Sequence, residues 1–321
     1  MKNIYLNIYK PNLSNLRKAK KSIENNNVIG LPTETVYGLA GNPYSDKSVQ
    51  KIFYLKKRPT FNPLIIHFKN LNDLKNDVII NDNFLKLYKK LCPGPITFIL
   101  KKNSSSKVSK LAIANKKTIA VRFPKHPVAR KLLKILKTPL AAPSANMSSK
   151  LSSTSALDVV DEFGKKINFI LDGGRCKIGL ESTIIDLTGK PTILRQGSIT
   201  AELIYKILKK RIIFKSKLKK IISPGQLKSH YSPGIPVYMN KINASTDGAF
   251  ITFGNKFKNA KNVFNLSINN NLNEAANNLY KTMRKIKKSG FSSIAVCTIP
   301  NRGIGKAINE RLKKASHKWK K

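Results

Sequence analysis

The sequence predicts an α/β protein in two parts: a large domain built on a mixed sheet and a small second domain. Over residues 1–210, short apolar strands alternate with segments of helical spacing, which is typical of an α/β fold. Residues 211–236, RIIFKSKLKKIISPGQLKSHYSPGIP, mix basic residues with three prolines and follow no sustained period, so they are predicted to be a linker. The alternation of strands and helices resumes over residues 237–321.

The large domain begins with a predicted helix over residues 12–25 and the short strand VIGLP. Another helix is predicted over 45–55; Pro59 prevents it from continuing, so Lys56–Arg58 lie at or just past its C-terminus. Further helices are predicted over 126–136 and 155–163. The predicted strands that follow are LIIHF, ITFIL, TIAVRF, PLAAPSAN, INFILDGG, STIIDL and TILRQG.

The small domain has fewer elements. VYM, AFITFG and SSIAVCTIP are predicted strands, and helices are predicted near residues 271–288 and from residue 304.

The charge is strongly basic, with 61 Lys and Arg against 16 Asp and Glu, for a net charge of +45. Such a charge attracts polyanions, including RNA and nucleotides. An AT-rich genome would produce the same excess, since the codons of Lys, Asn and Ile are AT-rich. Both explanations stay open, and so does a non-enzymatic RNA-binding protein.

Three cysteines lie far apart, and no CxxC or Cys/His cluster is present, which argues against a structural zinc site. The start MKNIYLNIYK lacks the apolar stretch of a signal peptide, and no apolar run approaches the roughly 20 residues of a membrane-spanning helix. A cytoplasmic protein without a membrane partner is therefore expected.

Common nucleotide and nucleophile motifs are absent from the sequence: there is no GxxxxGK[ST], no GxGxxG after a strand and no GxSxG. The four histidines are not spaced as metal ligands, and no metal site is predicted.

Polar side chains instead gather at the ends of apolar strands. They are Thr33, Glu34, Thr35 and Tyr37 in PTETVYG, Arg122 in AVRFP, Ser144, Asn146 and Ser148 in APSANMS, Ser182 and Thr183 in ESTIID, and Arg195 in ILRQG. Each segment alone fits a structural role, and Arg122 in an apolar run needs an anionic partner. Together, these hydroxyls, amides and cations would bind and position anions, which is what displacement at a phosphate requires.

These segments resemble the threonylcarbamoyl-AMP synthases, whose catalytic part is the YrdC-like domain. PTETVYGLAG, KKRPTFNPL, PGPITFIL, AVRFP, APSANMS, DGG, ESTIIDL and ILRQG occur in the family's order over about residues 28–197. PGQLKSHYSPGIPV resembles the linker of the two-domain form, and GIGKAINERLKKAS resembles the end of its small C-terminal domain.

The resemblance implies a YrdC-like twisted mixed sheet with a concave basic pocket over residues 1–210, a linker over 211–236 and a small Rossmann-like domain over 237–321. Because HYSPG is a polar, proline-bounded insertion, the linker is predicted to act as an active-site lid. It also implies the reaction of L-threonine, bicarbonate and ATP to threonylcarbamoyl-AMP and pyrophosphate. A separate transferase complex would then modify a tRNA adenosine next to the anticodon. Transfer from carbamoyl phosphate, as in larger maturation enzymes, would need further domains whose cysteines are absent.

The resemblance also implies roles for particular residues. The family's Lys-x-Arg corresponds to Lys56 and Arg58, and its Ser-x-Asn to Ser144 and Asn146, as catalytic groups. Lys57 is expected to be solvated. ATP would be contacted by Arg58, Asn62, Thr118, Ser144, Ser152 and Arg195, with Tyr231 and Val237 closing over it. Threonine would be contacted by Thr35, His67, Arg122, Ser182 and the backbone of Ala142.

A metal is expected only as Mg²⁺ carried on ATP, with Glu34 and Glu181 as outer-shell groups. A weak contact with tRNA is compatible with the charge.

Overall fold

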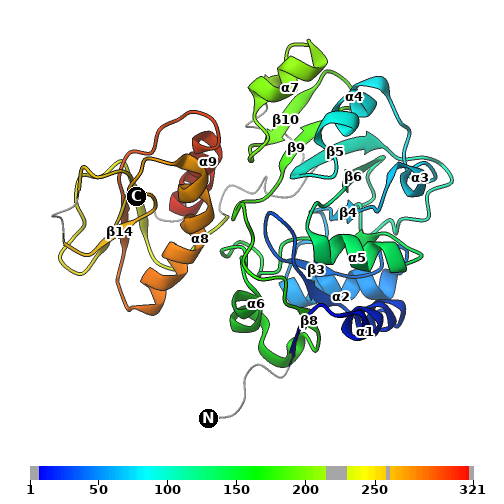
Figure 1. Cartoon of the computed structure of the whole chain (residues 1–321), viewed down its shortest axis with the longest axis horizontal. Helices are drawn as coiled ribbons and strands as arrows, with labels where there is room; N and C mark the ends of the chain where they lie inside the picture. The colour runs from blue at the N-terminus through cyan, green and yellow to red at the C-terminus, as the bar shows by residue number, and fades with distance from the viewer. Residues whose placement is uncertain (1–6, 215–229, 258–260, 318–321) are drawn as a thin grey trace.

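A computed structural model describes residues 7–214, 230–257 and 261–317 of the chain. They form a large body and a small one, which lie side by side in Figure 1. Residues 215–229 of the predicted linker lie outside the described residues.

The large body contains two mixed sheets where the sequence predicts one. The first has the order β1(Ile8–Tyr9), β8(Ile170–Leu171), β2(Ile29–Leu31), β3(Gly38–Ala40). The second has the order β11(Ile213–Phe214), β10(Thr192–Arg195), β9(Thr183–Asp186), β5(Ile96–Lys101), β6(Thr118–Arg122), β4(Ile65–His67), β7(Leu140–Ala141).

The two sheets meet where β3 passes β7. The backbones of Gly41 and Ala141 exchange two hydrogen bonds, and a further bridge joins Gly38 to Ser144. Pro143 lies between these bridges and has no N–H to donate, so a continuous ladder cannot form there. The sheets are therefore joined along an interrupted seam, and the pocket described below borders it.

Helices with polar caps surround the sheets. They are α1(Leu13–Glu24), α2(Asp46–Lys56), α3(Leu71–Leu74), α4(Asp82–Leu91), α5(Pro127–Ile135), α6(Ala156–Phe163) and α7(Ala201–Leu208), with a 3₁₀ turn over Gly164–Lys166. The predicted helices over 12–25, 45–55, 126–136 and 155–163 are confirmed. Asn12, Ser45, His126 and Ser155 cap them, each accepting a backbone N–H with its side chain.

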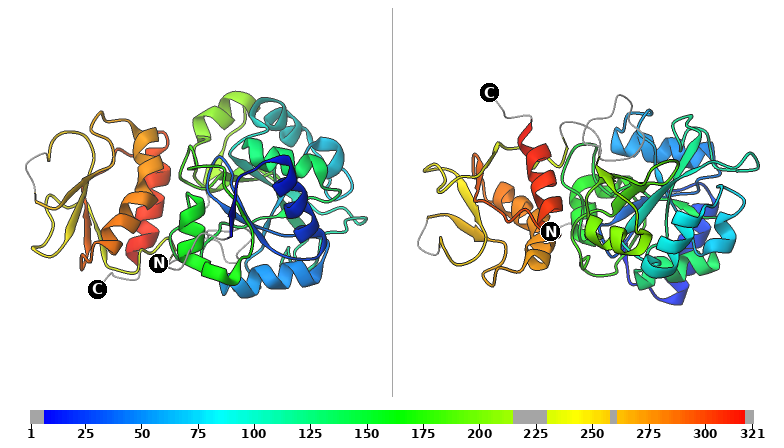
Figure 2. Two further views of the ribbon diagram at one scale, coloured as in Figure 1. Left: turned by 60° about the horizontal axis from the view of Figure 1, so that its bottom comes forward. Right: turned by 90° about the horizontal axis from the view of Figure 1, so that it is seen from above.

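The small body has an entirely parallel sheet of the order β12(Val237–Met239), β15(Ile294–Val296), β13(Ala249–Thr252), β14(Val263–Asn265). Its helices α8(Leu272–Lys288) and α9(Gly305–Ser316) lie between this sheet and the large body in Figure 1 and in both views of Figure 2. β14 is not predicted from the sequence, because Val263-Phe264-Asn265 is too short to show a period.

The core of the small body continues into the large one. Val36, Leu151 and Leu180 of the large body are buried in the same apolar cluster as Leu279 and Tyr280 of α8. Burial of shared apolar surface stabilises this arrangement of the two bodies.

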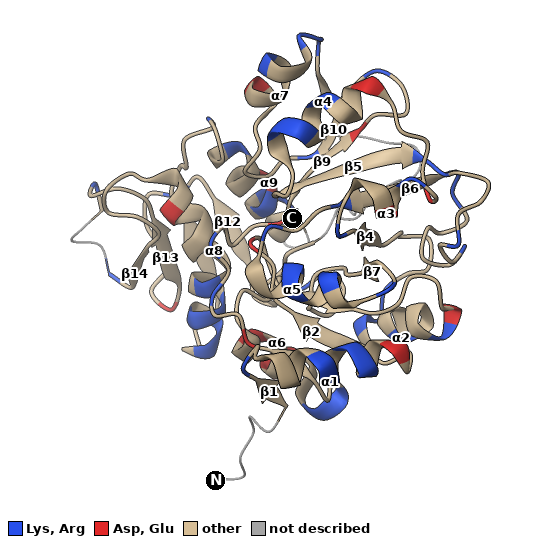
Figure 3. Ribbon diagram, turned by 45° about the vertical axis from the view of Figure 1, so that its right-hand side comes forward, with Lys and Arg blue, Asp and Glu red and all other residues tan. Residues whose placement is uncertain are grey.

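Lys and Arg are spread over most helices (Figure 3). Among the described residues, no helix is long and apolar enough to cross a membrane.

Candidate active site

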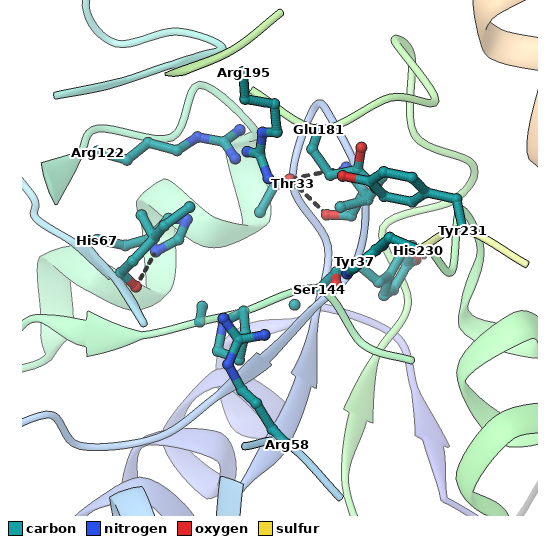
Figure 4. A pocket seen from close by; sticks show the side chains of 15 residues that line it. Thr33, Tyr37, Arg58, His67, Arg122, Ser144, Glu181, Arg195, His230 and Tyr231 are labelled. Atoms are coloured by element: carbon teal, nitrogen blue, oxygen red, sulfur yellow. Dashed lines mark hydrogen bonds between the residues drawn. The ribbon is translucent and has the colours of Figure 1, made fainter. Parts of the chain in front are cut away.

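A pocket lies in the large body beside the seam between the sheets, and Figure 4 shows the side chains around it. Its walls come from the loop between β2 and β3, the loop after α2, and the ends of β4, β6, β7 and β10. Two residues that precede the small body complete it. The lining residues are Thr33, Val36, Tyr37, Gly38, Arg58, Ile65, His67, Arg122, Ala142, Pro143, Ser144, Glu181, Arg195, His230 and Tyr231.

One edge of the seven-stranded sheet brings several polar side chains together. His67 at the end of β4 is in register with Arg122 at the end of β6, and Arg122 is in register with Thr97 on β5. Ser182 comes just before β9, and its Oγ lies 2.7 Å from Oγ1 of Thr97. Arg195 ends β10 beside them, so five neighbouring strands bring hydroxyls, an imidazole and cations to one place.

Arg122 is buried and paired with Glu34. Its Nη2 lies 2.7 Å from Oε1 of Glu34, whose Oε2 also accepts the backbone N–H groups of Lys125 and His126. Although burial raises the pKa of Glu34, the Arg122 charge and these hydrogen bonds bring it below its usual value. Glu34 therefore stays ionised at neutral pH, and the Arg122 guanidinium beside it reaches the pocket.

His67 is buried next to Arg122. Burial, followed by the Arg122 charge, lowers the pKa of His67 to about 3, so its imidazole is neutral. Its Nδ1 lies 3.3 Å from the carbonyl oxygen of Ile65.

Arg58 lies across the pocket from Arg122 and Arg195 in Figure 4. Asn62 holds it: Nε of Arg58 donates to the Asn62 carbonyl oxygen at 2.9 Å, and Nη2 donates to Oδ1 of Asn62 at 2.7 Å. Burial and then the charge of Arg195 lower the pKa of Arg58 to about 9. The positive charges of Arg58 and Arg195 destabilise each other, so an anion bound between them would stabilise both.

Lys56 and Lys57 have opposite environments. Lys57 caps α2 in the left-handed conformation and is exposed, as predicted. Lys56 is buried, and its Nζ donates to the carbonyl oxygens of Ser144 and Asn146 at 2.5 Å each. Lys56 thus ties the end of α2 to the loop that carries Ser144.

Arg195 is held by Ser182. Its Nε donates to the Ser182 carbonyl oxygen and its Nη2 to the Ser182 Oγ, both at 3.0 Å. The neighbouring Glu181 accepts from Oγ of Ser152 at 2.5 Å and from the hydroxyl of Tyr280 in α8.

His230 and Tyr231 enter the pocket from the segment before β12. The backbone of Tyr231 has a φ of 62°, in the left-handed region that an aromatic residue rarely adopts. Its ring centroid lies 4.0 Å from that of His230. Such a conformation persists where the surroundings over-determine it, which is common at functional sites.

Unpartnered polar atoms concentrate around this pocket. Ten buried side-chain nitrogen or oxygen atoms lack a hydrogen-bond partner within the described part of the chain. Half of them belong to pocket residues or to residues directly behind the pocket: Asn62 Nδ2, Arg122 Nε, Asn146 Oδ1, His230 Nδ1 and Tyr231 Oη. Buried polar groups are nearly always paired, so this concentration indicates a polar ligand.

Most of the predicted site residues meet here. Seven line the pocket: Arg58, His67, Arg122, Ala142, Ser144, Arg195 and Tyr231. Six lie directly behind it and bond to lining residues: Thr35, Lys56, Asn62, Asn146, Ser152 and Ser182.

Two predicted residues do not line this pocket. Thr118 begins β6, four residues before Arg122, which places it about 13 Å away toward the opposite edge of the sheet. Val237 begins β12 and is buried in the small body's core. Their contacts with ATP stay predictions. Conversely, His230 lines the pocket without having been predicted; its one signal is its place beside Tyr231 in HYSPG.

Comparisons with known proteins match both bodies. The Sua5/YciO/YrdC family model, described as telomere recombination, matches residues 21–197, and the model of the threonylcarbamoyl-AMP synthase C-terminal domain matches residues 199–317. Threonylcarbamoyl-AMP synthase of Pyrococcus abyssi is 36% identical over 324 residues, which cover 94% of each chain. The Schizosaccharomyces pombe enzyme is 40% identical over 199 residues, which cover 55% of this chain and 49% of that protein.

A solved structure agrees with these matches. P. abyssi Sua5 in complex with L-threonine superimposes with a TM-score of 0.87 at 32% identity, covering 97% of this chain and 96% of that one. Because the similarity extends through the catalytic body, the linker and the small body, this chain belongs to the threonylcarbamoyl-AMP synthase family, in its two-domain form.

Proposed function

We propose that this chain condenses L-threonine, bicarbonate and ATP into threonylcarbamoyl-AMP and releases pyrophosphate. The threonine amine would add to the carbon of CO₂ derived from bicarbonate and lose a proton, forming a carbamate. A carbamate oxygen would then bond to the α-phosphorus of ATP as the bond from that phosphorus to the β-phosphate oxygen breaks. Family membership favours this enzymatic interpretation over a protein that only binds RNA.

The convergence of Arg58, Arg122 and Arg195 on one pocket is the observation that carries the proposal. Carbamate and triphosphate are both anions, and bringing them together in a partly dry site is costly without cations. Glu181 is the one carboxylate among the lining residues, and an arginine of the small body pairs with it.

Threonine would bind at the sheet edge around Arg122. The guanidinium has a buried Nε without a partner among the described residues, which suits a carboxylate beside Glu34. We assign Thr35, His67, Ser182 and the backbone of Ala142 to the same subsite. The P. abyssi structure with bound L-threonine supports a threonine site in this fold.

ATP would occupy the side of the pocket that holds Arg58, Arg195 and Ser144, with Tyr231 against it. Asn62 would act by orienting Arg58, and Ser152 by bonding Glu181. Lys56 and Asn146, predicted as catalytic, would keep the Ser144 loop in place, since the Lys56 Nζ is occupied by two carbonyl oxygens of that loop. Thr118 and Val237 complete the proposed ATP contacts.

Mg²⁺ would arrive on the phosphates of ATP. Glu181, which lines the pocket, and Glu34, which pairs with the lining residue Arg122, are both engaged by arginines, so the nucleotide would be the main source of ligands. The product would pass to a tRNA threonylcarbamoyl transferase complex.

The proposal is tested by incubating the full chain with ATP, L-threonine and bicarbonate and detecting the adenylate by mass spectrometry. Pyrophosphate release should require all three substrates, and Arg58→Ala should nearly abolish it. Salt-sensitive binding of RNA without such release would support the RNA-binding alternative instead.

A further inference from the structure

Arg311 occupies a position in α9 where the sequence pattern calls for an apolar residue. Ala307, Ile308, Leu312 and Ala315 form the buried face of this helix, and Arg311 lies among them with 1% of its surface exposed. A buried guanidinium is costly unless it is paired and hydrogen-bonded.

The partners of Arg311 include three groups from beyond the small body's helices. Its Nε donates to Oε2 of Glu181 at 2.8 Å, and its Nη2 donates to the carbonyl oxygen of Gln196 at 2.9 Å. The guanidinium also lies over the ring of Tyr231, 5.0 Å from the centroid. Glu310, next to it on α9, accepts the backbone N–H of Gln196.

Two of these three partners line the pocket, and the third adjoins a lining residue. Glu181 and Tyr231 line it, while Gln196 directly follows Arg195. Glu181 directly precedes Ser182, to which Arg195 is bonded. One guanidinium of the small body therefore fastens both chain segments that carry the Ser182–Arg195 pair.

The backbones of these two segments are in close contact. A Cβ built on Gly197 would lie 2.4 Å from the backbone nitrogen of Thr183 and 2.8 Å from the carbonyl oxygen of Glu181. A shift of Glu181 would be transmitted to Ser182 and Arg195.

Arg311 also balances charge. The side chains facing Glu181 are Arg311 from α9, Tyr280 from α8, Arg195 from β10, Ser152, and Tyr231 with its neighbour His230. Burial raises the pKa of Glu181, but the charges of Arg311 and then Arg195 outweigh it and lower the pKa to about 2. Without Arg311, this pocket would hold a less compensated anion at the place where anionic substrates are proposed to bind.

We propose that Arg311 is a positioning residue for the condensation: it neutralises Glu181 and holds the Ser182–Arg195 pair, which makes the small body part of the active site. This inference rests on the proposed function. It gives the small body a role in substrate binding and turnover.

The test compares Arg311→Met with the double variant Glu181→Gln/Arg311→Met in the full chain. We expect Arg311→Met to lower kcat/KM for ATP on the order of 10- to 100-fold. Its activity relative to wild type should rise as the pH falls, because the released Glu181 then takes up a proton and loses its charge. Removing that charge in the double variant should restore ATP affinity to near that of Glu181→Gln alone.

Lys306→Met is the matched control. Lys306 is also on α9 and pairs with Glu202 of the large body at 2.6 Å, but it does not line the pocket. It should retain wild-type kinetics. Wild-type kinetics of Arg311→Met, an equal loss in Lys306→Met, or no restoration of ATP affinity in the double variant would each overturn the inference.

Circular dichroism and thermal unfolding show whether each variant folds. Should Arg311→Met not fold, Arg311→Lys is used: its ammonium keeps a cation near Glu181 but lacks the planar fork that reaches Gln196 as well. Reduced turnover in folded Arg311→Lys supports the inference, and wild-type turnover refutes it. If the wild-type chain releases no pyrophosphate, the proposed function fails. The ATP affinities of the same variants, measured by calorimetry, then show independently whether Arg311 supports nucleotide binding.

Discussion

Replacing Tyr231 by Phe should move stability and activity in different directions. The Tyr231 hydroxyl is buried and has no hydrogen-bond partner among the residues that the structure describes. Burial raises the pKa of this hydroxyl to about 12, so at neutral pH it is a protonated donor. In the proposed complex its partner would be a charged group of the nucleotide.

The magnitudes follow from this environment. A buried hydroxyl without a partner costs about 1–3 kcal/mol, so removing it should leave the free energy of unfolding unchanged or raise it by up to that amount. A hydrogen bond to a charged ligand contributes about 1.5–3 kcal/mol. Its loss should lower kcat/KM for ATP by about 10- to 150-fold.

Tyr44→Phe provides the matched contrast. The Tyr44 hydroxyl donates to Oδ2 of Asp77 at 2.6 Å, and Tyr44 does not line the pocket. Because Asp77 is buried and would lose this donor, the variant should lose up to about 1.5–3 kcal/mol of stability and keep its activity.

Both variants are measured by urea unfolding without substrates and by pyrophosphate release with ATP, threonine and bicarbonate. Wild-type kcat/KM in Tyr231→Phe would show that the Tyr231 hydroxyl does not bind the nucleotide. A loss of stability as large as that in Tyr44→Phe would show that the hydroxyl already has a partner in the free protein.

Two further predictions concern the charged residues. Arg58→Ala should lower kcat/KM for ATP by on the order of 100-fold or more, since it removes a buried cation from the proposed phosphate site. The neighbouring Lys57 is exposed, so Lys57→Ala should keep a kcat/KM close to that of the wild type in the same assay. Glu34→Gln should lower the free energy of unfolding by about 3–5 kcal/mol, because it leaves Arg122 buried without its counter-charge. As the folded-state pKa of Glu34 is lowered, its stabilisation is complete above the unfolded-state value and is lost as the pH falls through the folded-state pKa. Denaturant unfolding at several pH values should therefore show the wild type and Glu34→Gln converging in acid, and a constant difference would contradict the assignment.

Local pattern was enough to locate the loop that carries Arg58. A helix with a Ser45 cap and a stop at Pro59 places Lys56, Lys57 and Arg58 at its end, and the structure has α2 end at Lys56. The local sequence does not show which of these three cations faces the pocket. Lys56 turns to the carbonyl oxygens of Ser144 and Asn146, some 90 residues away, and Arg58 reaches the pocket.

The order of strands could not be predicted from the sequence alone. Each strand is a short apolar run, so its residues reveal a strand but not its neighbours. The register that puts His67 beside Arg122 and Thr97 depends on pairings among β4, β6 and β5. Between β3 and β7 only isolated bridges form around Pro143, so the predicted single sheet is divided into two.

By itself, the sequence determined the α/β class, the family and the main helices with their caps. It also predicted fifteen site residues, thirteen of which lie in or directly behind one pocket, while their roles stay predictions. These features depend on helix caps, hydrophobic periodicity and short motifs, each of which involves only residues close together in the sequence. Tertiary structure alone decided that His230 lines the pocket and that Arg311 meets Glu181 across 130 residues of chain. The role of a buried charge depends on the group it pairs with, and here folding brings that group from a distant segment of the chain.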